Sequence, residues 1–270
     1  MKKMKRILPY LGMLFGFLLV SFYPVIEWKN AQERGKIIEN LDLQNTQTDS
    51  DVKKELLLQA RSYNEMLAGE EMEVPLDDIW KYDRQLSQSE INVPFAYITI
   101  PELDLNMPIF HGTTDEVLSA GVGHLKGTSL PIGGESTHTV LSAHSGMQNT
   151  KAFDDIKLLR VGDVFGITVL NDLYCYRVTG TETVLPDQVD SIRIEPGKDL
   201  ATLVTCTPYG INTHRYLVHA KRCEIPPEFE QEHARPESVF RSVRNLPFLA
   251  GLSILLILAG VFVIKEIEKS

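Results

Sequence analysis

Two long uncharged stretches constrain this chain more than any other feature of its sequence. Residues 7–26 and residues 245–264 each run without a charged side chain. A helix that rises about 1.5 Å per residue needs about 20 residues to cross about 30 Å of hydrocarbon. Both stretches therefore predict transmembrane helices, with most of the 270 residues lying between them.

The residues around the first stretch indicate which way the chain crosses the membrane. Four of the five residues at positions 2–6 are Lys or Arg, and such clusters mark the cytoplasmic side. Residues 21–24, Ser-Phe-Tyr-Pro, are too bulky for a small-x-small cleavage site, which favours an uncleaved anchor over a cleaved signal peptide. The second stretch then returns residues 265–270 to the cytoplasm. The prediction is a cell-membrane protein whose main part is extracellular.

Composition narrows what this exterior part can do. A formal net charge of −9 disfavours a nucleic-acid-binding surface, which needs clustered positive charge. A hydrophobic fraction of 43% excludes a disordered tail. Three cysteines exclude a disulfide-dense miniprotein and leave at least one thiol unpaired. A disulfide between Cys175 and Cys223 is a minor alternative to two packed thiols.

Changes in composition divide the chain into five segments. They are residues 1–27 (cytoplasmic tail and first transmembrane segment), 28–94 (helical region), 95–225 (main domain), 226–244 (juxtamembrane linker) and 245–270 (second transmembrane helix and short cytoplasmic tail). In the helical region apolar residues recur at helical spacing up to Gly69, with a polar break at 45–50. We therefore expect one long or two shorter helices before the main domain.

The main domain is built from short β-forming runs that Gly and Pro separate. These runs are residues 96–100, 139–143, 164–169, 174–178, 201–205 and 216–220. Their close spacing predicts a closed or sandwiched antiparallel β domain rather than alternating βαβ units. Short helices are expected near residues 115–118 and 152–156. No phosphate-binding glycine loop or CxxC pair occurs in the sequence.

Cys206 stands at the end of one β run, and Arg215 opens the next. If the two runs pair as a hairpin, the thiol and the guanidinium face each other, which favours the nucleophilic thiolate. Such a nucleophile also needs a group that protonates its leaving amine, and Arg cannot supply that proton. His144 closes another β run and is the best candidate. The alternative is a packed Cys beside a solvated Arg.

The other histidines favour structural roles. His111 and His124 lie beside glycines, and His138 opens a β run. A zinc site made from these three residues lacks the usual ligand spacing. The sequence therefore implies neither a metal nor an organic cofactor.

The sequence around Cys206 resembles a known family. Residues 202–218 read TLVTCTPYGINTHRYLV, which is similar to the sortase signature TLxTCTPYGxNTxRLLV in the form typical of class C, pilin-polymerising sortases. Supporting stretches are 108–112 (PIFHG), 121–131 (GVGHLKGTSLP) and 140–146 (VLSAHSG). Where the usual motif has an Arg after the His, this chain has Ser145.

The resemblance implies a mainly β fold, the sortase-type eight-stranded β-barrel with short helices, preceded by N-terminal helices and flanked by two transmembrane helices. It implies a cysteine transpeptidase that cleaves an LPXTG-like sorting signal between Thr and Gly and passes the acyl group to a pilin Lys. Cys206 would be the nucleophile, His144 the general acid and base, and Arg215 a substrate or oxyanion contact. Thr205 and Thr207 are possible oxyanion or substrate neighbours.

Class C sortases also have a lid, Asp-Pro-aromatic, ahead of the barrel. Asp78-Ile79-Trp80 resembles it, with Ile79 in place of Pro. The acidic residue would pair with the catalytic Arg, and the aromatic ring would cover the Cys. Because the Pro ring that fixes φ is missing, this segment should be less pre-set. An ordinary loop with a buried Trp is the alternative.

The implied partners are pilin subunits with sorting signals and acceptor Lys residues, together with the cell membrane and no nucleic acid. The catalytic domain is expected to be a monomer facing the cell wall. The nearest alternative is a sortase that anchors surface proteins to peptidoglycan, and a more distant one is a non-catalytic surface scaffold. A papain-like protease is disfavoured, because its Cys precedes its His in the chain and here His144 comes first.

Overall fold

A computed structural model describes residues 26, 29–69, 82–86, 93–145, 152–227 and 229. The two predicted transmembrane stretches, apart from residue 26, lie outside these residues, as do Asp78 and Trp80. Among the described residues no helix has both the length and the apolar character needed to cross a bilayer. The chain divides into two compact units, Met1–Gln32 with Gln231–Ser270, and Glu33–Glu230. Nearly all described residues belong to the second unit.

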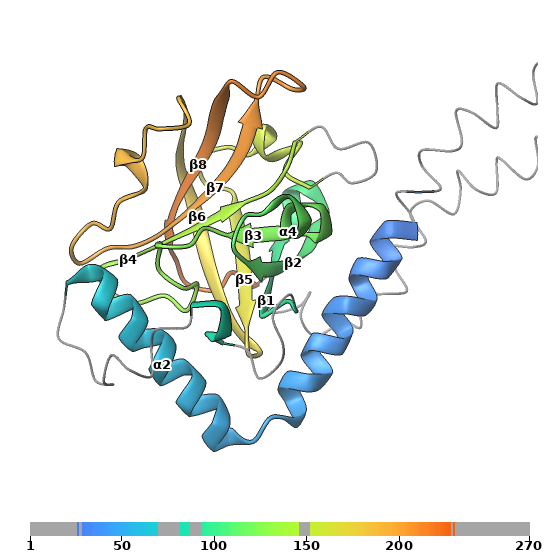
Figure 1. The fold of residues 1–270 in the computed structure, drawn as a ribbon, viewed down its shortest axis with the longest axis vertical. Coiled ribbons are helices and arrows are strands. Elements are labelled where there is room, and N and C mark those ends of the chain that lie inside the picture. The colour runs from blue at the N-terminus through green and yellow to red at the C-terminus, as the bar shows by residue number, and fades with distance from the viewer. Residues whose placement is uncertain are drawn as a thin grey trace, which may run out of the picture. The chain divides into compact units, whose positions relative to one another are not determined.

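The second unit is built around a closed eight-stranded β-barrel (Figure 1). Around the barrel the strands follow the order β1-β2-β3-β4-β7-β8-β6-β5. Their bounds are β1 Ala96–Ile100, β2 Leu105–His111, β3 Val122–His124, β4 Thr137–Ser142, β5 Val164–Val169, β6 Asp172–Val184, β7 Asp199–Thr207 and β8 His214–Arg222. The helices are one over residues 29–47, α2 Ser50–Ala68 and α4 Asp115–Ala120. Short 3-10 turns are η1 Tyr82–Arg84, η2 Pro101–Leu103, η3 Ile156–Leu158 and η4 Asp190–Ile192.

The mainly β barrel agrees with the sequence prediction, but two details differ. The expected runs correspond to β1, β4, β5, β6, β7 and β8, whereas β2 and β3 were not predicted. β2 contains Pro108, and β3 is three residues long with Gly123 at its centre, so neither has a clear strand pattern. The expected antiparallel pairing holds for the other strand pairs, but β2 pairs with β3, and β4 with β7, in parallel.

The alternation of side chains defines an inner and an outer face for the three strands that carry the predicted site. Leu141, Leu203 and Val218 are fully buried in the barrel core. His144 and Cys206 each lie three residues after one of these positions, and Arg215 lies three before the last. Because successive side chains alternate between faces, an odd separation along a regular strand puts a residue on the opposite face. The three predicted residues therefore belong to the outer face.

The helical region is packed against the barrel as well as leading toward it. α2 begins after Asp49, whose side chain caps it, and ends at Gly69 with a left-handed φ of 76°, as glycine favours at such ends. The Asn64 side chain donates to the Leu130 carbonyl at 3.1 Å and accepts from the Leu130 N–H at 2.7 Å. These two buried bonds hold α2 on the loop that precedes β4. The preceding helix contributes Ile38 and Leu41, which are buried together with Tyr97 of β1.

Tyr82 attaches the short turn η1 to the barrel. Its side chain is 4% exposed, and its hydroxyl lies 2.8 Å from His124 Nδ1 and 2.8 Å from the His124 carbonyl. The same oxygen accepts from the Gly112 N–H at 3.1 Å. Burial raises the pKa of Tyr82 above its ordinary value, so this hydroxyl stays neutral and acts as a hydrogen-bonding anchor.

Candidate active site

Three adjacent strands bring His144, Cys206 and Arg215 to one rim of the barrel. β4 and β7 are parallel, with Ser142 opposite Val204, and the chain continues two residues further on each strand to His144 and Cys206. β7 and β8 are antiparallel neighbours, shown in orange in Figure 1, and Cys206 lies directly opposite Arg215. Side chains directly opposite each other on antiparallel strands have Cβ atoms about 5 Å apart. The structure thus groups the three predicted residues, although His144 is 62 positions from Cys206 in the sequence.

Beyond the last regular pair of β4 and β7, hydrogen bonds continue to hold the two strand ends together. The Ala143 N–H donates to the Val204 carbonyl at 3.2 Å. The Thr205 hydroxyl donates to the Ala143 carbonyl at 3.0 Å, and the Ser145 hydroxyl donates to the Cys206 carbonyl at 2.7 Å. Thr205 and Ser145 are both buried. The backbones that carry His144 and Cys206 are therefore fixed relative to each other on both sides.

The β7–β8 connection, residues 208–213, begins with a cis peptide bond between Thr207 and Pro208. The Pro208 carbonyl accepts from the N–H groups of Ile211 and Asn212 at 3.0 and 2.9 Å, which closes a compact turn. Arg215 Nη1 donates to the carbonyls of Asn212 and His214 at 3.0 and 3.1 Å. The guanidinium is thereby held at the turn, and its remaining N–H groups point to a role in binding an anionic or carbonyl oxygen.

Thr205 and Thr207 occupy different places. Thr205 is 1% exposed on the inner face, and its hydroxyl proton is used in the bond to Ala143. Any contact of Thr205 with a substrate would therefore come from its backbone. Thr207 is half-buried on the strand end, and its hydroxyl accepts from Lys157 Nζ at 3.2 Å. This contact places η3 beside the end of β7.

The three cysteines are all free thiols. Cys175 is buried, and desolvation raises the pKa of its thiol to about 12. Burial also raises the pKa of Cys223, whose N–H donates to the Cys175 carbonyl at 3.0 Å. The minor alternative of a Cys175–Cys223 disulfide is not what the structure has. Cys206 differs from both, because it is half-buried at the strand end and lies directly opposite Arg215.

Of the three histidines considered for zinc, His124 and His138 are hydrogen-bonded within the domain, whereas His111 has a buried Nε2 with no hydrogen-bond partner. His124 Nε2 lies 2.9 Å from the Ser129 carbonyl, so this nitrogen carries the proton. Nδ1 is then an acceptor that shares the single Tyr82 hydroxyl proton with the His124 carbonyl. Desolvation lowers the pKa of His111 and of His124 to about 4. His138 bonds to the Arg193 carbonyl and to Thr202. The hydrogen bonds of His124 and His138 hold both rings in place within the folded domain.

Comparison with known proteins agrees with this geometry. A sortase-domain family profile matches residues 98–223. The solved structure of Clostridium perfringens sortase C with the C-terminal cell wall sorting motif is 38% identical, covers 70% of this chain and 98% of its own, and superposes with a TM-score of 0.62. The chain belongs to the sortase family. Sortase C1 of GBS Pilus Island 1, at 36% identity over 71% of this chain and 93% of its own, has a TM-score of 0.64.

The solved neighbours of this sortase support its placement in class C. Among curated sequences it is 33% identical to sortase A of Streptococcus agalactiae over 127 residues, or 46% of this chain and 51% of that protein. The chain therefore spans about half the length of that curated relative. The barrel carries the likeness, since the family profile begins within β1 and ends just after β8.

Proposed function

We propose that this sortase is a cysteine transpeptidase that joins a sorting signal to an amine through a thioester on Cys206. The observation that carries the proposal is the grouping of Cys206, His144 and Arg215 on three adjacent strands at one rim. Sortases as a family are cysteine transpeptidases. A thiol, an imidazole and a guanidinium are sufficient for acyl transfer by covalent catalysis.

The proposed reaction has two balanced steps. In the first, Cys206 Sγ attacks the Thr carbonyl carbon of an LPXTG-like signal, the C–N bond to Gly breaks, and His144 gives a proton to the departing amine. In the second, an acceptor amine loses a proton to His144 and attacks the thioester, which breaks the C–S bond and frees the thiolate. Arg215 stabilises the substrate carbonyl oxygen as it gains negative charge, an interaction of a few kcal/mol in comparable sites.

The proposed acceptor is a Lys side chain of a pilin subunit, so that successive reactions build a covalent polymer. Two similarities support this choice. One neighbour belongs to a pilus island, and another was solved with a sorting motif. Anchoring of surface proteins to a wall-precursor amine is the second candidate, since sortase A is among the curated relatives.

The lid and the membrane location belong to the same proposal and rest on the sequence. Asp78 would pair with Arg215, and Trp80 would cover Cys206, which restrains the free enzyme. The uncharged stretches 7–26 and 245–264 would anchor the chain, with the barrel outside the cell.

The test is incubation of the full chain with an LPXTG-like peptide, followed by mass spectrometry of Cys206. We expect a peptide thioester on Cys206 that disappears when an amine is added. Adding purified pilin should give a ladder of polymers, and a wall-precursor amine should give a single conjugate if anchoring is the true activity. Absence of any acyl adduct, with the thiol intact and reactive, would refute the transpeptidase proposal.

A further inference from the structure

Ser145 occupies a position that the mechanism above does not use. It follows His144 directly, is 7% exposed, and donates its hydroxyl to the Cys206 carbonyl at 2.7 Å. The last regular pair of β4 and β7 is Ser142 with Val204. His144 therefore lies beyond the end of β4, where strand ends otherwise fray, while Cys206 is still paired with Arg215 of β8 but no longer with β4.

Resting on the proposed function, we infer that Ser145 is a positioning residue that sets the spacing between His144 and Cys206. It connects the strand of the general acid to the backbone of the nucleophile itself. Thr205 makes the complementary connection in the opposite direction, to the Ala143 carbonyl. Catalysis by a positioned acid depends on geometry at the level of an ångström, so the loss of one connection should slow acyl transfer without removing a reacting group.

The experiment compares Ser145→Ala, Ser145→Thr and Cys206→Ala in the full chain. Single-turnover acylation by a sorting peptide should fall about tenfold in Ser145→Ala with little change in KM, and Ser145→Thr should restore most of the rate. The pH profile of Cys206 alkylation should also change in Ser145→Ala, which a merely structural role would not produce. Thr99→Val is the matched control, because it removes one buried side-chain bond, Thr99 to Asn106, on β1.

The outcomes are separable. A wild-type acylation rate and pH profile in Ser145→Ala, with Cys206→Ala inactive, would overturn the role of Ser145 and leave the proposed function standing. Equal slowing in Ser145→Ala and Thr99→Val would also overturn it. If Cys206→Ala retained full activity, the proposed function itself would be wrong.

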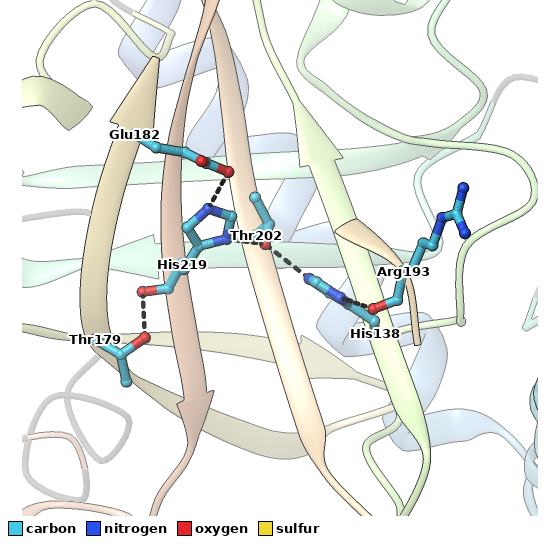
Figure 2. Close-up of polar contacts among 6 residues, drawn as sticks. All are labelled: His138, Thr179, Glu182, Arg193, Thr202 and His219. Atoms are coloured by element: carbon cyan, nitrogen blue, oxygen red, sulfur yellow. Dashed lines mark hydrogen bonds and ion pairs between the residues drawn. The ribbon is translucent and has the colours of Figure 1, made fainter. Parts of the chain in front are cut away.

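A second, independent observation lies at the other end of the same outer face. Figure 2 shows a row of polar contacts across four strands, from Glu182 through His219 and Thr202 to His138 and on to Arg193. We call Glu182, His219, Thr202 and His138 the belt. The distances are 3.0 Å from Glu182 Oε1 to His219 Nε2, 2.9 Å from His219 Nδ1 to Thr202 Oγ1, 2.7 Å from Thr202 Oγ1 to His138 Nε2, and 2.8 Å from His138 Nδ1 to the Arg193 carbonyl.

The donors and acceptors along the belt fix the number of protons that its two imidazole rings need. Both ends are pure acceptors, a carboxylate and a carbonyl, so His219 Nε2 and His138 Nδ1 must each carry a proton. Thr202 has a single hydroxyl proton and can donate to only one of its two imidazole neighbours. The other neighbour must donate to Thr202. The two rings therefore need at least three protons, one more than two neutral imidazoles possess.

We infer that the belt stores one extra proton, and that all four of its contacts, including the one to the Arg193 carbonyl in the 185–198 connection, are closed only while it holds that proton. The connection joins β6 to β7, and the belt holds it through the Arg193 carbonyl. Burial disfavours a charge on His138 and lowers its pKa. When the extra proton leaves, one of the four contacts brings two acceptors together and must open.

Other charged groups near the belt lie on β6 and in the 185–198 connection. Glu182 also accepts a bond from Ser191 of η4, which holds the pKa of its carboxyl below the ordinary value. Glu195 lies close enough to His138 to favour its charged form but is paired with Lys198. The Arg193 side chain pairs with Asp190 at 2.8 Å. Within the described residues, Glu182 is therefore the acidic partner bonded to the belt histidines.

The experiment measures hydrogen exchange of residues 185–198 in the full chain across pH 5–9, corrected for intrinsic rates. Protection should fall by tenfold or more as the pH rises in the wild type. Thr202→Val removes the central hydroxyl, so its protection should be low and flat with pH. Nitrogen-15 spectra should show one imidazolium shared by His138 and His219 at the low end of the range. Two neutral rings throughout, or identical exchange profiles for wild type and Thr202→Val, would overturn the inference.

Discussion

The outer face of β4, β7 and β8 has two ends that are built in opposite ways. At the belt end the side chains bond to one another, and the described polar atoms of His138 and Thr202 are all engaged. At the site end the backbones are held, by Ser145 and Thr205. Among the residues that the structure describes, none hydrogen-bonds the Cys206 thiol or the His144 ring. The comparison teaches that side chains of one sheet face can be bonded to one another at one end while the thiol and the imidazole proposed for catalysis stay unbonded at the other.

The strongest test of this contrast removes a reactive side chain. Cys206→Ala should lower acyl transfer by roughly 10³-fold or more, because no thioester can form. Its thermal stability should stay close to wild type, since the thiol holds nothing in the described structure. The measurement is peptide cleavage together with the unfolding midpoint. A large loss of stability would mean that the site end is structural too.

The next prediction concerns folding stability at acidic pH, which should depend on the buried histidines His111 and His124 rather than on the outer face. His111 and His124 have pKa values of about 4 in the fold, lowered by desolvation, against about 6.5 unfolded. Below pH 6.5 these histidines bind protons in the unfolded chain but stay neutral in the folded chain. The free energy of unfolding should therefore fall as the pH drops from about 6.5 to about 4. Each histidine would contribute on the order of 3 kcal/mol at the acid end. Urea unfolding at several pH values measures this slope.

His124→Gln provides the control for that slope. Glutamine keeps polar groups near Tyr82 and Ser129 but does not titrate. The variant should be less stable at neutral pH, yet its stability should depend less steeply on acid. An unchanged slope would mean that other groups govern the acid response.

A smaller effect is expected at the belt end. Thr202→Val keeps the shape of a fully buried side chain but removes its hydroxyl, leaving two imidazole nitrogens without a partner. Unfolding should become easier by about 1–3 kcal/mol, while single-turnover acylation changes by less than twofold. Denaturant unfolding and acylation of the same sample compare the two ends directly. If Thr202→Val lost most of its activity but kept its full stability, the belt end would serve catalysis rather than stability, contrary to the proposal.

The smallest expected effect concerns the proposed lid. Trp80→Ala should raise the rate of Cys206 alkylation by a few fold, because a covering ring is removed from the thiol. Trp28→Ala, which removes the other Trp of the chain, is the matched control and should leave the rate unchanged. Equal rates in wild type and Trp80→Ala would argue that this segment does not restrain the site end.

Features of the fold and site that depend on residues close together in the sequence could be predicted, whereas those that depend on distant strand pairing could not. Cys206 and Arg215 are joined by a short turn, so their opposition followed from hairpin geometry alone. Gly69 marked the end of α2 for the same local reason. The nearness of His144 to Cys206 did not follow, because it depends on the parallel pairing of β4 with β7 across 62 positions. There the family resemblance supplied what spacing could not.

Residues with ordinary polar side chains were the least predictable. Ser145 drew notice only as a departure from the family motif, and nothing in its neighbours pointed to the Cys206 carbonyl. Thr202 and His219 read as common strand residues, because their bonds connect β7 with β4, β8 and β6. β2 and β3 escaped prediction because Pro108 and Gly123 hide the strand pattern, whereas pairing with longer neighbours stabilises both strands.

The parallel pairing of β4 with β7 has a consequence for how such enzymes can diversify. Adjacent parallel strands end at the same edge of a sheet. The segments that follow His144 and Cys206 therefore begin at neighbouring points. Either segment can lengthen, shorten or change composition while the strands beneath stay in register. Under the proposed function, recognition of a different sorting signal can thus evolve at the edges of the site while the strands that carry His144 and Cys206 stay unchanged.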